Sequence, residues 1–286
     1  MRDVSTICAG IVTYNPKLDL LEENLHALLP QVDKVLIVDN CSDNVSNIEV
    51  LVEESPKTYI IKNKSNSGIA KALNQLCSEA SRMGYLWILT MDQDSICQPD
   101  MVAQLLFFAD SEKYGIIAPR VEFWDEGQLI YSTKDGDKPT VEVDACITSG
   151  SLTNIRAWEK VNGFDEWFFI DHVDNEFCTH LKVCGYHILR VNKAVLRQRA
   201  GFMKHVSVPF FGKLLLPYYN EQRNYYICRN TVYFIRKYHA DIDLVHQVGA
   251  FIYSQLVKLV FEPHRWATTR STVKGVFHGF KKKIES

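Results

Sequence analysis

The stretch Leu89-Thr90-Met91-Asp92-Gln93-Asp94-Ser95 ends an apolar run from Tyr85 with two carboxylates one residue apart. The run predicts a buried strand, and the carboxyl ends of strands in open α/β sheets are where ligands bind. Carboxylate oxygens there suit Mg²⁺ or Mn²⁺ that is bound jointly by the protein and a phosphate-bearing ligand. A sugar-nucleotide diphosphate is one such ligand. We therefore expect Asp92 and Asp94 to bind the metal. The alternative is that Asp94 only caps the helix near Pro99.

Strand and helix signals alternate upstream of this stretch. Residues 7–12, 35–38 and 59–61 predict strands, and leucines at helical spacing between the first two predict a helix. A second helix, at residues 69–83, follows the loop at residues 63–68. This β-α-β-α-β order predicts an α/β fold with a mostly parallel central sheet flanked by helices.

Composition narrows the class of protein further. The 286 residues are 47% hydrophobic and 23% charged, which is enough to bury a full core, and the net charge of −2 gives no attraction to nucleic acid. The eight cysteines form no C-x-x-C pair, which argues against a zinc site and favours a reducing compartment. We interpret the first residues as leading into a strand and not as a secretory signal, and no run reaches the roughly 18 apolar residues of a membrane span.

The second half of the chain has a looser pattern. We expect strands near residues 115–119, 147–148 and 187–191, a hairpin or loop at 125–138, and a helix from about 171 to 184. Beyond residue 212 the pattern becomes helical, so we divide the chain into a ligand-binding domain, 1–212, and a C-terminal segment, 213–286. That segment has a stretch rich in tyrosine and arginine and a basic end, which fits either a membrane interface or an ordinary amphipathic helix.

Two further sets of acidic residues are candidates for function. Asp171 and Asp174 are three residues apart on the predicted helix and would share one of its faces, where a carboxylate could act as a general base or merely cap the helix. Asp39 ends the second strand and could bind a base or ribose, or simply form a turn. The sequence has neither G-x-G-x-x-G after the first strand nor a P-loop, which argues against dinucleotide-binding Rossmann and P-loop proteins.

Five segments together resemble family 2 glycosyltransferases, which have the GT-A fold. They are Val12-Thr13-Tyr14-Asn15, Val38-Asp39-Asn40, residues 66–74 (NSGIAKALN), residues 91–95 (MDQDS) and residues 169–178 (FIDHVDNEFC). The last two are most similar to the rhamnosyltransferase branch, whose bacterial members build O-antigen and related polysaccharides from dTDP-L-rhamnose. The resemblance covers roughly residues 5–235 and implies an inverting, metal-dependent transferase.

The resemblance also implies roles for individual residues. Thr13 and Asn15 would line the nucleotide pocket, and Asp39 would contact the pyrimidine. Asp92 would approach the ribose or metal, and Asp94 would bind the ion on the diphosphate. Asp174 matches the catalytic base, with Asp171 as second candidate. Three further residues would lie near the nucleotide: Asn66, Gly68 and Lys71. The loop beneath the donor sugar would contain Ser149 and Gly150.

The chain departs from the family at two places. His180 stands where many relatives have Arg, and Gln198 lies where many have a His that binds the metal. Gln198 is a poor ligand, and His205 is the candidate to replace it.

The resemblance and the basic C-terminal end give an expected partner and location. The acceptor would be a polyprenyl-diphosphate-linked saccharide, and the protein would be cytoplasmic, peripheral on the inner face of the cytoplasmic membrane. The sequence leaves three alternatives open: another donor, as in a galactosyl- or glucosyltransferase; a phosphohydrolase with an aspartyl nucleophile; and a non-catalytic saccharide-binding protein.

Overall fold

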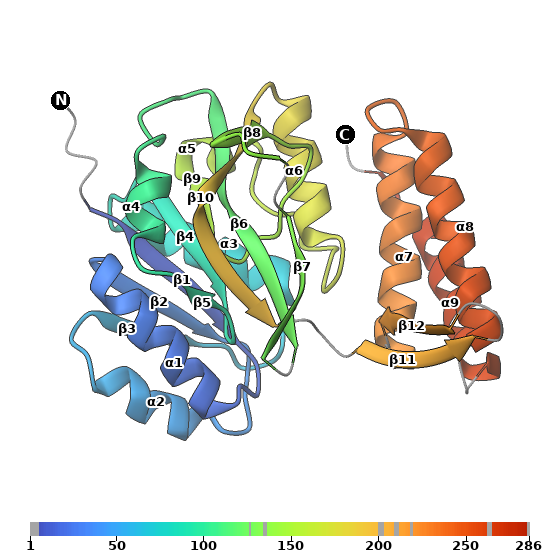
Figure 1. The fold of residues 1–286 in the computed structure, drawn as a ribbon, viewed down its shortest axis with the longest axis horizontal. Coiled ribbons are helices and arrows are strands. Elements are labelled where there is room, and N and C mark those ends of the chain that lie inside the picture. Colours follow the sequence, from blue (N-terminus) through green and yellow to red (C-terminus); the bar gives the residue numbers. More distant parts are fainter. Residues whose placement is uncertain are drawn as a thin grey trace. The chain divides into compact units, whose positions relative to one another are not determined.

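The computed structural model describes residues 6–125, 127–133, 136–199, 203–208, 212–217, 220–261 and 265–284, with the backbone only for 203–208, 212–217 and Phe261 (Figure 1). The chain divides into two compact units. The first comprises Met1–Trp167 and Val173–Arg199, and the second comprises Phe168–His172 and Ala200–Ser286. The division thus falls after Arg199, whereas the functional division at residue 212 stays a prediction.

The first unit is built on one mixed sheet with the strand order β3-β2-β1-β4-β9-β6-β10-β5. The strands β3, β2, β1 and β4 are parallel, β9 is antiparallel to both of its neighbours, and β6 and β10 are parallel. Two short strands extend the sheet, β7 beside β6 and β8 beside β10. In chain order the strands are β1 Cys8–Thr13, β2 Lys34–Asp39, β3 Thr58–Lys62, β4 Trp87–Asp92, β5 Ile96–Cys97, β6 Tyr114–Asp125, β7 Gln128–Ser132, β8 Thr140–Glu142, β9 Ser151–Asn154 and β10 His187–Arg199.

Helices cover both faces of this sheet, which confirms the α/β fold class. Apolar side chains of α1 (Leu18–Leu28), α2 (Val45–Glu53) and α4 (Met101–Leu106) share one buried cluster with Ala9 and Ile11 of β1. The long helix α3 (Ile69–Arg82) lies on the opposite face, where a Cβ at Gly10 would come within 2.9 Å of Leu76 Cδ1. Figure 1 shows α1 and α2 in front of the strands and α3 behind them. The short η1 (Leu29–Gln31), α5 (Ile155–Lys160) and α6 (Val173–Val183) complete this unit.

Two local predictions were wrong for conformational reasons. Residues 147–148 are not a strand; the strand is β9, which begins after Gly150, a residue with φ +76°. The helix predicted from about residue 171 begins instead at Val173, because Asp171 and His172 have left-handed φ values of 64° and 63°. Asp171 and Asp174 therefore do not share a helix face.

In its described residues, the second unit contains a hairpin and three helices. Strands β11 (Met203–Val208) and β12 (Gly212–Pro217) are antiparallel, and α7 (Glu221–Tyr238), α8 (Leu244–Phe261) and α9 (Arg265–Lys281) follow. The helical character predicted for this part of the chain is confirmed. Along the described segments, no helix combines the length and apolarity needed to cross a bilayer.

Candidate active site

Parallel pairing aligns the carboxyl ends of three strands. Thr13 at the end of β1 pairs with Asp39 at the end of β2, and Val12 pairs with Asp92 at the end of β4. The Asp39 carboxylate is buried, and it accepts hydrogen bonds from Thr13 Oγ1 at 3.0 Å and from Ser42 N at 2.9 Å. Asp39 is thus held rigidly at the sheet edge.

The loops after β1 and β2 are joined through Asn15. Its backbone N–H donates to Ser42 Oγ at 2.8 Å, and its side-chain oxygen accepts from Asp43 N at 2.7 Å. The backbone of Asn15 is left-handed, with φ 47°, which asparagine tolerates better than most residues. Sequence reasoning selected Asn15 but missed Ser42, whose only signal was its place three residues after Asp39.

The loop before α3 is attached to the same edge. Asn66 Oδ1 accepts from Gly68 N at 2.9 Å, and Asn40 Nδ2 donates to the Gly68 carbonyl at 3.1 Å. Lys71 behaves differently, because its Nζ lies 4.0 Å from Glu166 Oε2 and its side chain lines a hollow of about 650 Å³ beside Trp158. The structure therefore gathers Asn66 and Gly68 with Asp39 but places the Lys71 side chain against a different carboxylate.

The loop at residues 148–150 links the carboxylates after β4 to the start of α6. The backbone N–H of Asp92 donates to Ser149 Oγ at 3.0 Å, and Gly150 N donates to the Thr90 carbonyl at 2.7 Å. From the same loop, Thr148 N donates to Asp174 Oδ1 at 3.3 Å. Two acidic groups about 80 residues apart in sequence are brought to one loop in this way.

Burial raises the pKa values of the acids gathered here, and at Asp92 mutual repulsion adds to the effect. The pKa of Asp92 is raised to about 7, first by burial and then by the charges of Asp174 and Asp94, while the hydrogen bond from Gln198 opposes the rise. Burial also raises the pKa of Asp94, against the opposing charge of Arg199. A bound cation would offset this repulsion, so the electrostatics suit a positively charged ligand.

A closed ring of hydrogen bonds fixes the Asp92 side chain. Gln198 Nε2 donates to Asp92 Oδ2 at 3.0 Å, and Gln198 Oε1 accepts from the Ser95 hydroxyl. Ser95 and Ser149 share a hydrogen bond of 2.8 Å, in which Ser149 must donate because the Ser95 proton is already used. Since Asp92 N donates to Ser149, the ring returns to Asp92. Gln198 presents its amide nitrogen to the carboxylate, which makes it a positioning residue.

Asp171 lies in different surroundings from Asp174. It belongs to the second unit, where Arg223 Nη2 donates to Asp171 Oδ1 at 3.1 Å. Asn230 Nδ2 donates to the carbonyls of Ile170 and Asp171 at 2.7 and 2.9 Å. The Asp171 carboxylate is thus bound by a guanidinium. Neither Arg223 nor Asn230 was selected from the sequence, since both lie more than 50 residues away.

The donor set fits a divalent ion only in part. Among the residues that the structure describes, no three His, Cys, Asp or Glu side chains form a complete metal site. Asp92 and Asp94 could supply two carboxylate ligands, with a bound diphosphate supplying others, as is common for Mg²⁺. The His205 side chain lies outside the described residues, so its role stays a prediction.

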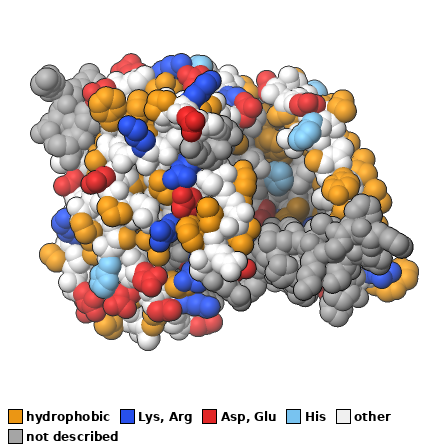
Figure 2. Space-filling model, viewed as in Figure 1, with side chains coloured by type: hydrophobic (Ala, Val, Ile, Leu, Met, Phe, Trp, Pro, Cys, Tyr) orange, Lys and Arg blue, Asp and Glu red, His pale blue; other side chains and the backbone are white. Residues whose placement is uncertain are grey.

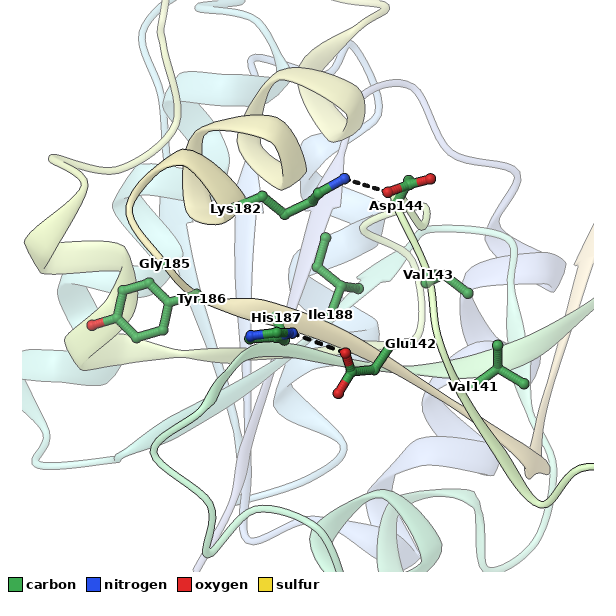
Figure 3. A pocket seen from close by; sticks show the side chains of 9 residues that line it. All are labelled: Val141, Glu142, Val143, Asp144, Lys182, Gly185, Tyr186, His187 and Ile188. Carbon is green, nitrogen blue, oxygen red and sulfur yellow. Dashed lines mark hydrogen bonds and ion pairs between the residues drawn. The ribbon is translucent and has the colours of Figure 1, made fainter. Parts of the chain in front are cut away.

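A separate hollow of about 560 Å³ lies between β8, the end of α6 and the start of β10 (Figure 3). Its acids are already paired, Asp144 with Lys182, and Glu142 with His187 at 2.9 Å. Lys113 also contacts Glu142, at 2.5 Å. This hollow contains none of the residues selected from the sequence.

A mixed sheet flanked by helices, with acids at one edge, is consistent with a nucleotide-sugar transferase, and comparison with known proteins identifies the family. The sequence profile of glycosyl transferase family 2 matches residues 8–183. The chain belongs to this family and is a glycosyltransferase.

One relative and two solved structures illustrate the likeness. The chain is 30% identical over 263 residues to the dTDP-rhamnosyl transferase RfbF of Shigella flexneri, covering 84% of this chain and 83% of that protein. The structure of GalNAc-T7 with UDP, GalNAc and Mn²⁺ superposes with a TM-score of 0.63 at 11% identity, over 83% of this chain and 48% of that one. The structure of TarS of S. aureus (residues 1–349) with UDP-GlcNAc superposes with a TM-score of 0.56 at 15% identity, over 85% of this chain and 69% of that one. The chain thus spans about half of the GalNAc-T7 chain, and it has the GT-A fold of these glycosyltransferases.

Proposed function

We propose that the protein transfers L-rhamnose from dTDP-L-rhamnose to a hydroxyl of a saccharide acceptor, with inversion at the anomeric carbon. The likeness to a dTDP-rhamnosyl transferase over most of both chains supports the donor. The observation that carries the chemistry is the loop at residues 148–150, which joins Asp92 to Asp174. A ligand-binding carboxylate and a second acid therefore lie around one loop.

In this proposal Asp174 is the general base. Thr148 N holds one of its oxygens, and the carboxylate accepts the proton of the acceptor hydroxyl as that oxygen bonds to the anomeric carbon. The bond between the anomeric carbon and the diphosphate oxygen breaks in the same step, and dTDP leaves with that electron pair. Asp171, whose carboxylate is bound by Arg223, is the second candidate.

Asp92 and Asp94 are proposed to hold Mg²⁺ or Mn²⁺. When bound, the ion would stabilise the negative charge on the departing dTDP. The ring through Ser149, Ser95 and Gln198 would keep Asp92 aimed at the diphosphate. Thr13, Asn15, Asp39, Asn66 and Gly68 are proposed to form the nucleotide pocket, Lys71 to lie near the nucleotide, and Ser149 and Gly150 to support the donor sugar.

We further propose a lipid-linked acceptor, a polyprenyl-diphosphate saccharide used in building O-antigen or another cell-surface polysaccharide. The protein would then act as a peripheral protein at the inner face of the cytoplasmic membrane. The support for this location is the basic end of the chain, in which Lys281, Lys282 and Lys283 follow one another.

The test compares Asp174→Asn with Asp171→Asn, and with Asp110→Asn as an exposed acid outside the site. The readout is dTDP released from dTDP-L-rhamnose in the presence of a lipid-linked saccharide. We expect Asp174→Asn to lower turnover by about 10²–10⁴ while dTDP still binds, and the other two to have much smaller effects. A larger loss in Asp171→Asn would move the base to Asp171. Turnover with UDP-glucose or UDP-galactose but not with dTDP-L-rhamnose would refute the donor.

A further inference from the structure

Helix α8 has an inverted distribution of polar and apolar side chains. Val245, Val248, Ile252, Leu256 and Leu259 follow at spacings of three and four, so they lie on one helix face. All five are exposed, with Ile252 at 53% and Leu256 at 56%. Figure 2 shows hydrophobic side chains gathered along the right-hand edge, over α8.

Two polar side chains of α8, Gln255 and Lys258, contact the other helices of the same unit. Gln255 Oε1 accepts from Thr272 Oγ1 of α9 at 3.0 Å and from Cys228 Sγ of α7 at 3.5 Å. Lys258 Nζ donates to Asn224 Oδ1 of α7 at 2.7 Å. A helix whose outer face met only water would have the opposite arrangement, because burying apolar side chains against its neighbours stabilises the fold. The outer face of α8 is therefore suited to an apolar environment.

Charge identifies that environment. Residues 244–284 contain seven Lys and Arg and a single Glu, although the whole chain has a net charge of −2. α9 has no acidic residue and carries an exposed Trp266, at 90%, together with exposed Phe277 and Phe280. Exposed aromatic rings interspersed with Lys and Arg favour the interface of an anionic bilayer, whereas a second copy of so basic a surface would be repelled.

We propose that the exposed stripe of α8 inserts into the headgroup region of an anionic membrane, with the basic side chains of α9 binding its phosphates. This inference rests on the proposed function, because a lipid-linked acceptor gives the protein a reason to bind a membrane. The apolar contact with the membrane is made by α8, which precedes the basic end of the chain. Because Gln255 and Lys258 of α8 contact α9 and α7, only the outer face of the helix would meet the membrane, and the helix would lie along the surface.

The test is vesicle flotation of the full chain carrying Ile252→Gln with Leu256→Gln. The matched control is Val50→Gln, an aliphatic side chain on α2 that is 60% exposed. With vesicles of phosphatidylethanolamine and phosphatidylglycerol, we expect the α8 variant to partition about 10- to 100-fold more weakly than wild type, and the control to be unchanged. Lys281→Glu with Lys282→Glu should also weaken binding, and added salt should do the same.

Several outcomes would overturn the inference. Equal flotation of wild type and the α8 variant would do so, as would equal binding to vesicles of phosphatidylcholine alone. A wild-type dimer in sedimentation that the α8 variant dissociates, without vesicle binding by either, would assign the face to a second copy. Titration of each variant with dTDP separates this test from that of the proposed function, because vesicle binding without dTDP binding would contradict only the latter.

Discussion

Two glycines of α9 allow it to lie unusually close to α7, and replacing one of them gives a sharp test of the structure. In Gly275-Val276-Phe277-His278-Gly279, a Cβ at Gly275 would lie 2.5 Å from the carbonyl oxygen of Tyr225 and 2.9 Å from Cys228 Cβ. A Cβ at Gly279 would lie 2.5 Å from the carbonyl oxygen of Arg229. Both nearest atoms belong to the α7 backbone, so no rotation of a side chain can relieve the contact.

Two opposing effects determine the outcome of Gly275→Ala. Alanine favours the helix by about 1 kcal/mol over glycine. Overpacking against atoms that cannot rotate away costs about 1–3 kcal/mol, and at 2.5 Å from a backbone oxygen the upper part of that range applies. We therefore expect the free energy of unfolding to fall by about 1–2 kcal/mol.

Gly249→Ala on α8 is the matched control, because no atom lies within 4 Å of a Cβ there. It should raise the free energy of unfolding by up to about 1 kcal/mol through helix propensity alone. Urea unfolding followed by circular dichroism measures both variants. If Gly275→Ala stabilised the protein as much as Gly249→Ala, the close packing of α7 and α9 would be wrong.

Three further perturbations test other parts of the structure. Burial lowers the pKa of His172 from 6.5 to about 4, so the folded state resists a proton that the unfolded state accepts. The contribution of His172 to the free energy of unfolding should be full above about pH 6.5 and fall by up to about 3 kcal/mol toward pH 4. Acid titration of His172→Gln should show a smaller loss of stability than that of the wild type. Gln198→Ala removes a donor to the Asp92 carboxylate and should raise the pKa of Asp92 above about 7. Mn²⁺ binding at neutral pH, measured by calorimetry, should then weaken roughly two- to tenfold. An unchanged affinity for Mn²⁺ would show that Gln198 does not position Asp92. Gly150→Ala places a Cβ 2.9 Å from Leu196 and Pro119 at a φ of +76°, so thermal unfolding should occur several degrees lower; an unchanged midpoint would show that the loop tolerates the side chain.

The sequence was sufficient to predict the edge at which the acids gather. Apolar runs of strand length, separated by helical periodicity, determine a parallel order, and a parallel order aligns the strand ends that carry Asp39 and Asp92. The pattern beyond residue 212 likewise predicted helical structure, which α8 confirms. It could not indicate which face packs inward, because that depends on contacts of Gln255 and Lys258 with α7 and α9.

The features that the sequence did not predict depend on distant register or on local backbone conformation. Gln198 meets Asp92 across 106 positions, and only the pairing of β10 brings them together. Because glutamine is a poor metal ligand, Gln198 suggested a lost metal contact, whereas in the structure its amide nitrogen donates to the Asp92 carboxylate. Asp171 and His172 adopt left-handed conformations that no periodicity reveals, which is why the predicted shared face with Asp174 was wrong.

A cation-bound diphosphate at Asp92 and Asp94 is the central feature of the proposed function. Calorimetric titration of dTDP into wild type and Asp94→Ala, each with and without Mn²⁺, measures this directly. We predict that Mn²⁺ strengthens dTDP binding to the wild type and has no effect on the variant. Equal heats for wild type with and without the ion, or an undiminished Mn²⁺ effect in Asp94→Ala, would contradict the account.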